Sequence, residues 1–291
     1  MTISEVFNEY ERAEIRPSGM SNNTADRYRN SGKLLAEYLG DVNISDITIK
    51  DIIGFFEHLS TWQAPNTVRL NIISLRMVIK YCHNRGYSDL DYEDIKVPKT
   101  TKQQIEFLTQ SEMDELFKVV SAKKPGLYEI NRRRNIAMLR VLYDSGIRVG
   151  ELCRLNRNSI KDRTFTVVGK SKNPRICFIT SKCEDAISYY LELREDKEPA
   201  LFISAKTGRR ITTDGVREVF KTIRRNSCFK NVHPHIIRHS FATKMLDRGV
   251  DIRYIADLMG HESLDTTRIY THFTNPKLKM IYDKAQGSDS C

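Results

Sequence analysis

The stretch that decides the fold of this chain is residues 232–272, VHPHIIRHSFATKMLDRGVDIRYIADLMGHESLDTTRIYTH. It predicts helices near the C-terminal end, and it contains two clusters of basic and titratable side chains, VHPHIIRHSFAT and LMGHESLDTTRIYTH. A third cluster, SGIRVGELCRL, lies far upstream at residues 145–155. Together the clusters supply two arginines, several histidines and a tyrosine. This set of groups suits chemistry at a phosphodiester without a metal ion.

Each of these groups can take a physical role in phosphoryl transfer. Attack on a phosphodiester builds negative charge on its nonbridging oxygens, and the planar guanidinium groups of Arg148 and Arg238 can bind those oxygens in bidentate geometry. A tyrosine hydroxyl becomes a better nucleophile when nearby cations favour its phenolate, which makes Tyr270 the candidate nucleophile. The leaving oxygen needs a proton, and Lys170 or His235 can donate it.

The chain divides into two predicted domains, and all three clusters lie in the second. Residues 1–97 contain helical patterns bounded by cap and turn residues, and they predict a small helical bundle. Its three predicted helices fall within residues 21–40, 47–60 and 64–86. The polar stretch around Pro98 has no apolar periodicity and predicts a linker at residues 98–107. Residues 108–291 then form the second domain.

The second domain is predicted to be helical with one small sheet. Thr109 and Glu112 can form a capping box at the start of a helix, and a longer helix follows at residues 131–146. Residues 163–180 place two β-rich stretches around a turn that contains Gly, Ser, Asn and Pro, which indicates a hairpin with lysines at its tip. The stretch PALFIS, residues 199–204, predicts one more short strand. The expected fold class is therefore mainly α with a small β-sheet.

Composition and charge narrow the classes of function. The hydrophobic fraction is 40% and the charged fraction 29%, as in soluble globular proteins, and no apolar run is long enough to span a bilayer. We expect a cytoplasmic protein without a secretory signal, with six scattered and reduced cysteines. Residues 1–97 hold 11 Lys+Arg and 14 Asp+Glu, whereas residues 98–291 hold 36 and 23. This segregated positive charge favours nucleic acid as the partner.

Several further side chains have a functional and a structural interpretation. Arg69, Arg76 and Lys80 share one face of a predicted helix, either as DNA-binding candidates or as a solvated helix face. Glu151 lies one turn after Arg148, where it can form an ordinary salt bridge or support the arginine of a site. The histidines at 233, 235 and 239 lack the glutamate or cysteine pair of common zinc motifs, so we expect no metal and no cofactor. His239 is expected to position Arg238.

The sequence resembles the tyrosine recombinases, or phage-type integrases, and most closely their compact Xer-like members. The resemblance rests on four separated motifs in the family's order: GIRVGEL with Arg148, PHIIRHSFAT with His235 and Arg238, LMGH with His261, and TTRIYTH with Tyr270. It covers most of the chain. Agreement across four motifs makes the resemblance specific.

The resemblance implies a mechanism and an assembly. It implies a helical core DNA-binding domain followed by a catalytic domain that ends in a tail helix, and a tetramer that joins two DNA sites. Tyr270 would attack the scissile phosphate and leave a 3′-phosphotyrosyl bond, without ATP or metal. The hairpin lysine of the family aligns with Lys170, although Lys172 lies two residues away. The apolar stripe of the tail, within residues 276–286, would pack on a neighbouring subunit or on its own domain.

Other functions use similar residues. Resolution of chromosome dimers is the expected role, and a mobile-element or phage integrase of the same family is the alternative. A type IB topoisomerase would use the same groups to cleave one strand, allow rotation and reseal it. A noncatalytic DNA-binding regulator would keep the basic surface but would not need the full set of catalytic residues.

Overall fold

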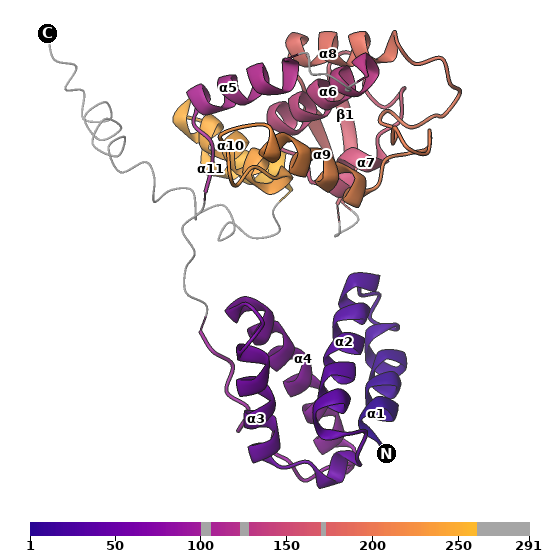
Figure 1. Cartoon of the computed structure of the whole chain (residues 1–291), viewed down its shortest axis with the longest axis vertical. Helices are drawn as coiled ribbons and strands as arrows, with labels where there is room; N and C mark the ends of the chain where they lie inside the picture. Colours follow the sequence, from indigo (N-terminus) through magenta and orange to yellow (C-terminus); the bar gives the residue numbers. More distant parts are fainter. Residues whose placement is uncertain (100–105, 123–127, 170–172, 261–291) are drawn as a thin grey trace, which may run out of the picture. The chain divides into compact units, whose positions relative to one another are not determined.

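The structure is a computed structural model of the 291-residue chain (Figure 1), and it describes residues 1–99, 106–122, 128–169 and 173–260. The chain divides into two compact units, Met1–Gln103 and Gln104–Cys291, and each has a hydrophobic core of its own. The predicted fold class, mainly α-helical with a small sheet, is confirmed. No helix within the described ranges is long and apolar enough to cross a membrane. The predicted domain boundaries stay a prediction.

The first unit is a bundle of α-helices joined by short turns. Its helices are α1 Ile3–Tyr10, α2 Asn22–Leu39, α3 Ile49–Ser60 and α4 Pro65–Asn84, with a π-helical turn at Glu11–Ile15 and a 3-10 turn at Ile44–Asp46. Ser21 caps α2, because its Oγ accepts a hydrogen bond from the backbone N–H of Thr24, and Gly40 ends this helix. Helices α1, α2 and α4 pack on one another, and their apolar faces form the core.

The second unit is built around one long helix. Its helices are α5 Gln110–Ser121, α6 Glu129–Ser145, α7 Val149–Arg154, α8 Ser181–Leu191, α9 Thr213–Arg225, α10 Pro234–Asp247 and α11 Ile252–Met259. Helix α6 contacts α5, α8 and α10 (Figure 1), and its buried apolar residues belong to the core of this unit. The predicted capping box of Thr109 and Glu112 begins α5 and is confirmed.

The predicted hairpin is confirmed as two antiparallel strands, β1 Thr164–Val168 and β2 Pro174–Phe178. Val167 pairs with Arg175, and Phe165 pairs with Cys177. Phe165, Val167 and Cys177 are buried, so these two cross-strand pairs face the core. Arg175 therefore starts from the inner face of the sheet, next to apolar neighbours.

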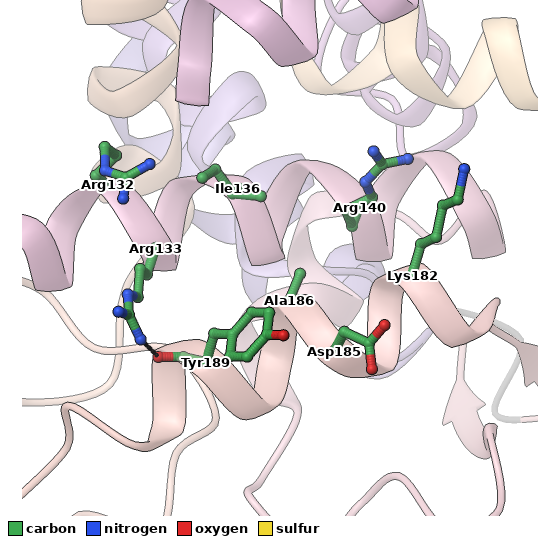
Figure 2. A pocket seen from close by; sticks show the side chains of 8 residues that line it. All are labelled: Arg132, Arg133, Ile136, Arg140, Lys182, Asp185, Ala186 and Tyr189. Carbon is green, nitrogen blue, oxygen red and sulfur yellow. Dashed lines mark hydrogen bonds between the residues drawn. The ribbon is translucent and has the colours of Figure 1, made fainter. Parts of the chain in front are cut away.

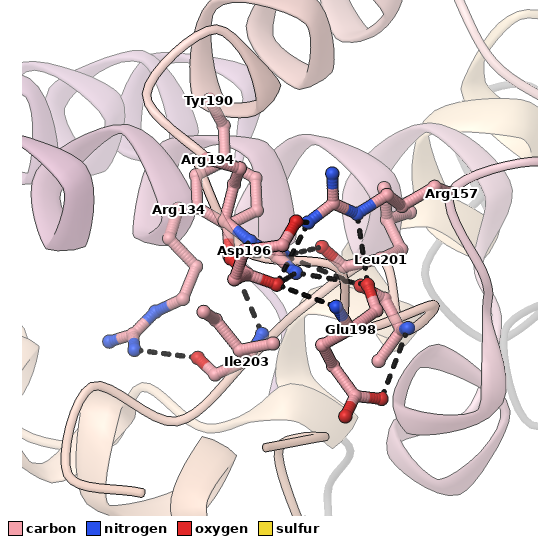
Figure 3. Close-up of polar contacts among 9 residues, drawn as sticks. Arg134, Arg157, Tyr190, Arg194, Asp196, Glu198, Leu201 and Ile203 are labelled. Carbon is pink, nitrogen blue, oxygen red and sulfur yellow. Dashed lines mark hydrogen bonds and ion pairs between the residues drawn. The ribbon is translucent and has the colours of Figure 1, made fainter. Parts of the chain in front are cut away.

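The strand predicted for PALFIS is wrong. The structure holds only isolated bridges there, between Asn156 and Ala200 and between Ile203 and Arg210. The carbonyl oxygens of Ala200 and Leu201 accept hydrogen bonds from the buried guanidinium of Arg194, at 3.3 and 3.1 Å (Figure 3). Because a side chain occupies these acceptors, the backbone does not form a continuous ladder. The β-rich composition is explained by burial, since Ala200, Leu201 and Phe202 lie in the interior.

Candidate functional site

The described part of the predicted site lies where α7, α10 and the end of α11 meet. Arg148 is the N-cap residue of α7, and α10 carries His235 and Arg238 in its first turns. Phe241, one turn further along α10, packs closely against Gly146 at the end of α6. Four predicted site residues and the tail helix lie outside the described residues: Lys170, Lys172, His261, Tyr270 and residues 276–286.

Three consecutive carbonyl groups at the C-terminal end of α11 bind three different arginines. The bonds join Arg175 Nε to Leu258 O at 3.0 Å, Arg238 Nη2 to Met259 O at 2.6 Å, and Arg148 Nη2 to Gly260 O at 3.0 Å. The last carbonyls of a helix have no partner within the helix, and they carry its partial negative charge, so cations are favoured there. The end of α11 thus gathers three guanidinium groups immediately before His261 in the sequence.

Arg238 is more deeply buried than Arg148, the other predicted arginine. It is 5% exposed, and its Nη1 also donates to the carbonyl of Gly146, the residue that ends α6. Arg238 therefore ties the ends of α6 and α11 to α10. The side chain of Arg148 is 34% exposed, so solvent or a ligand can reach it.

Glu151 is a buried carboxylate between two arginines. Its side chain is 2% exposed, and Oε2 accepts the backbone N–H of Arg148 at 2.8 Å, which fixes the start of α7. The guanidinium of Arg148 lies 3.4 Å from Oε1, which gives the predicted salt bridge. Burial alone would raise the pKa of Glu151, but the hydrogen bonds of Arg175 and of the Arg148 backbone hold this pKa below its ordinary value.

Arg175 is a member of this cluster that the sequence reasoning missed. Its Nη1 and Nη2 bind the two oxygens of Glu151 at 2.9 and 2.7 Å, in bidentate geometry. The strand alternation offered a signal, because Arg175 shares the inward-facing register of Cys177 in the predicted hairpin. An arginine at an inward-facing position needs buried hydrogen-bond acceptors, and Glu151 supplies two of them.

The histidines of α10 are held neutral by their surroundings. Burial, followed by the charges of Arg238 and Arg148, lowers the pKa of His235, and this residue still keeps an exposed surface. Burial lowers the pKa of His239 to about 4. The rings of His233 and His235 lie 6.3 Å apart, centroid to centroid. Among the described residues, no group of three or more His, Cys, Asp and Glu side chains could hold a metal ion.

The basic face predicted on α4 is engaged within the first unit. Arg69 Nε donates to the carbonyl of Pro98 at 2.9 Å, and Arg76 Nε donates to the carbonyl of Tyr92 at 3.1 Å. The ammonium of Lys80 lies 5.1 Å from the ring centroid of Tyr92. These three side chains therefore hold the segment that follows α4. Their binding to DNA stays a prediction.

A separate pocket of about 420 Å³ opens between α6 and α8 (Figure 2). It is lined by Arg132, Arg133, Ile136, Arg140, Lys182, Asp185, Ala186 and Tyr189, and by none of the predicted site residues that the structure describes. Arg132 and Arg133 both pair with Glu129, and the guanidinium of Arg140 lies 3.7 Å from the ring centroid of Phe117. These partners give the arginines a structural role along the two helices.

Comparison with known proteins agrees with this fold. The model of the phage integrase family matches residues 106–276. The tyrosine recombinase XerC of Oceanobacillus iheyensis is 33% identical over 97% of this chain and 94% of its own length. The crystal structure of the XerH site-specific recombinase bound to its difH substrate superposes with a TM-score of 0.70 at 18% identity, covering 95% of this chain and 83% of that one. The Tn1549 transposon integrase in complex with a circular intermediate DNA gives a TM-score of 0.75 at 16% identity, over 93% and 94% of the two chains.

The helical fold and the similarity along nearly the whole chain define the class of protein, a site-specific DNA recombinase. The chain belongs to the phage integrase family, the tyrosine recombinases, and it is of the Xer type.

Proposed function

We propose that this protein resolves chromosome dimers by cleaving and rejoining DNA through a covalent bond to Tyr270. The observation that carries the proposal is the convergence of Arg148 and Arg238 on adjacent carbonyls at the end of α11, directly before the segment with His261 and Tyr270. Backbone carbonyls fix the position of both guanidinium groups. Donors fixed in advance stabilise transition-state charge without reorganising during the reaction.

The proposed roles follow from the chemistry of each side chain. Arg148 and Arg238 bind the nonbridging oxygens of the scissile phosphate, where negative charge grows during attack. His235, whose pKa burial lowers, is a neutral imidazole at physiological pH and can donate one hydrogen bond to the phosphate. Glu151 and His239 support the two arginines. Arg148 lies at the start of α7, and His235 and Arg238 lie on α10.

The proposed reaction is an exchange of one phosphate ester for another. The Tyr270 hydroxyl loses its proton to water as its oxygen bonds to phosphorus, the bond from phosphorus to the 5′-oxygen breaks, and Lys170 gives that oxygen a proton. The products are a 3′-phosphotyrosyl bond and a free 5′-hydroxyl. The 5′-hydroxyl of the partner strand then attacks phosphorus and gives its proton to Lys170, and Tyr270 leaves as a phenolate that takes a proton from water. One ester bond forms for each that breaks, so the exchange needs no ATP.

A nicked suicide duplex tests the covalent step. When the fragment carrying the 5′-hydroxyl dissociates after cleavage, the protein stays attached to DNA and migrates as an adduct on a denaturing gel. We expect the wild type to form this adduct and Tyr270→Phe to form none, while Tyr282→Phe, a tyrosine of the tail, keeps the reaction. An absence of adduct on every candidate duplex, including host chromosomal fragments, would falsify the catalytic proposal.

The identity of the general acid is tested with a 5′-phosphorothiolate substrate. Its sulfur leaving group needs no proton, so the loss of the true proton donor no longer slows cleavage. We expect this substrate to rescue Lys170→Ala and not Lys172→Ala. Rescue of Lys172→Ala alone would assign the acid to Lys172 instead.

The biological role and the assembly form the finer part of the proposal. Relatives named XerC and XerA match this chain along 97% of its length, which supports a Xer role in the cytoplasm. In this proposal residues 1–97 form the core DNA-binding domain, residues 98–107 form the linker, and residues 108–291 form the catalytic domain. We infer that a tetramer joins two sites. Mapping the covalent adducts on the host genome should give one chromosomal site. Adducts at the ends of a mobile element would support integration, and relaxation of any supercoiled plasmid would support a topoisomerase.

A further inference from the structure

Arg175 connects three parts of the chain that carry predicted site residues. Its guanidinium binds Glu151 in α7, and its Nε binds the carbonyl of Leu258 at the end of α11. A Cβ on Gly260 would lie 2.8 Å from Nη1 of Arg175, and a Cβ on Gly169 would lie 3.9 Å from the same atom. Gly169 precedes Lys170 in the sequence, and Gly260 precedes His261.

The two arginines at Glu151 are not equivalent. Arg175 makes two bonds of 2.9 and 2.7 Å, whereas the guanidinium of Arg148 makes one contact of 3.4 Å. The side chain of Arg175 is 11% exposed and that of Arg148 is 34% exposed. Arg175 therefore provides most of the compensation for the buried charge of Glu151, whereas Arg148 makes a single long contact with this carboxylate.

This division determines what Arg148 can do. A buried carboxylate without a full partner is costly, so it attracts the nearest cation. Without Arg175, the only other guanidinium that the structure pairs with Glu151 among the described residues is that of Arg148. Arg148 would then turn toward Glu151 and away from a phosphate.

We propose that Arg175 is a positioning residue of the cleavage site: it satisfies Glu151 and anchors the end of α11, which keeps Arg148 available for the scissile phosphate. The inference rests on the proposed function, because it assumes that Arg148 binds the phosphate. Arg175 itself acts through Arg148 and is not assigned a contact with DNA.

The first test separates DNA binding from cleavage in Arg175→Met, which keeps most of the apolar stem. DNA affinity is measured by gel shift, and the single-turnover rate is measured on the suicide duplex with protein in excess. We expect the cleavage rate to fall by about 100-fold, as for a displaced catalytic group, while DNA affinity changes by about threefold or less, because Arg175 is assigned no DNA contact and the other Lys and Arg side chains remain. Equal losses of affinity and rate would overturn the proposal.

The matched control is Arg194→Met. Arg194 is also a buried arginine that binds a carboxylate, Asp196, and backbone carbonyls (Figure 3), but among the described residues its hydrogen-bond partners include no predicted site residue. We expect this variant to lose stability and to keep the cleavage rate of the DNA-bound protein. A loss of cleavage similar to that of Arg175→Met would show that disturbing any buried arginine is sufficient, and it would overturn the specific role.

The pH profile gives a readout that a purely structural role would not change. The charged and titratable groups that face Glu151 are Arg148 on α7 and Arg175 and Cys177 on β2. In Arg175→Met, ionised Glu151 captures Arg148 and protonated Glu151 releases it, so cleavage should fall as pH rises relative to the wild type. The double variant Glu151→Gln with Arg175→Met removes the anion. We expect it to cleave at least about tenfold faster than Arg175→Met, with a pH profile of cleavage parallel to that of the wild type.

Arg175→Lys keeps the proposal testable if Arg175→Met unfolds. It retains the charge but not the two-pronged geometry, so we expect an intermediate rate with the pH profile of the wild type. A wild-type rate in Arg175→Met, or a double variant no better than the single one, would overturn the role of Arg175 and leave the tyrosine mechanism intact. A wild type that forms no adduct would overturn both.

Discussion

His239 shows how one residue near the arginines couples the fold to pH. Burial lowers its pKa to about 4, and the neighbouring His235 and Arg238 contribute to the same direction. A neutral imidazole lets His239 lie beside Arg238 on α10 without adding a second positive charge. The same burial makes protonation unfavourable in the folded protein.

The lowered pKa of His239 makes the free energy of unfolding depend on pH. In the unfolded chain a histidine has a pKa of about 6.5. Between this pH and about 4, His239 is therefore protonated in the unfolded state and neutral in the folded state. Above a pH of about 6.5 His239 contributes no pH dependence. As pH falls from 6.5 toward 4, the free energy of unfolding should decrease by about 1 to 3 kcal/mol from this group.

Urea unfolding of the wild type and of His239→Gln across pH 4–7 checks this linkage. The uncharged glutamine should remove that part of the pH dependence, so the free energy of unfolding should fall more steeply toward acid pH in the wild type than in the variant. Parallel curves would assign the acid sensitivity to other groups. His235, which is more exposed, serves as a comparison through His235→Gln, for which we expect a smaller change.

At the scale of elements, the termini of two helices hold the candidate site together. Gly146 ends α6 with φ +62°, and its carbonyl accepts a hydrogen bond from Arg238. A Cβ at this position would lie 2.3 Å from the Phe241 ring on α10. Close approach of α6 and α10 therefore depends on glycine here, both for the left-handed backbone and for the space.

Gly146→Ala should destabilise the protein by about 2 to 5 kcal/mol, since the left-handed backbone costs about 1 to 2 and overpacking costs about 1 to 3 kcal/mol. Gly249→Ala is the matched control, because Gly249 also has a positive φ, +82°, but no described residue lies within 4 Å of its Cβ position. The control should lose only the backbone part. Equal losses of unfolding free energy in urea would show that the contact with Phe241 is not limiting.

Elements with local signals could be predicted from the sequence. The predicted capping box of Thr109 and Glu112 begins α5, and the predicted hairpin forms two antiparallel strands. PALFIS was predicted wrongly, because its carbonyls bind Arg194, a contact that no periodic pattern encodes.

The long-range part of the site could not be predicted in the same way. Arg148 and Arg238 were named from their motifs, but their bonds to Gly260 and Met259 span 112 and 21 residues. The bond from Arg175 to Leu258 spans 83 residues. Such contacts follow from how α7, β2, α10 and α11 pack, and alternation along a strand indicates only that Arg175 faces inward. The sequence thus identified the residue types, and the fold supplied their partners.

At the scale of the whole molecule, charge is divided between the two parts of the chain. Residues 1–97 carry more acidic than basic side chains, and residues 98–291 carry the excess of Lys and Arg. DNA affinity should therefore decrease steeply with salt, mainly through the second part. The basic face of α4 is the exception to test, because its arginines already bind the carbonyls of Pro98 and Tyr92.

Two triple variants of the first unit test whether the basic face of α4 binds DNA. If the side chains of Arg69, Arg76 and Lys80 neutralise three phosphates, their replacement by Gln should make the plot of log affinity against log salt less steep by about 2 to 3. Replacement of Arg12, Lys33 and Lys50 by Gln removes the same charge elsewhere in this unit, and it should leave the slope unchanged. Circular dichroism checks that both variants remain helical.

The slope distinguishes a DNA-binding face from a purely structural one. Each arginine uses Nε for its backbone carbonyl, and a guanidinium has further N–H groups that can reach a phosphate. Anchoring the segment after α4 and binding DNA are therefore compatible, and we expect both. A first triple variant that keeps the wild-type slope, but is cleaved faster by protease between residues 91 and 107, would restrict these side chains to anchoring the connection between the two parts of the chain.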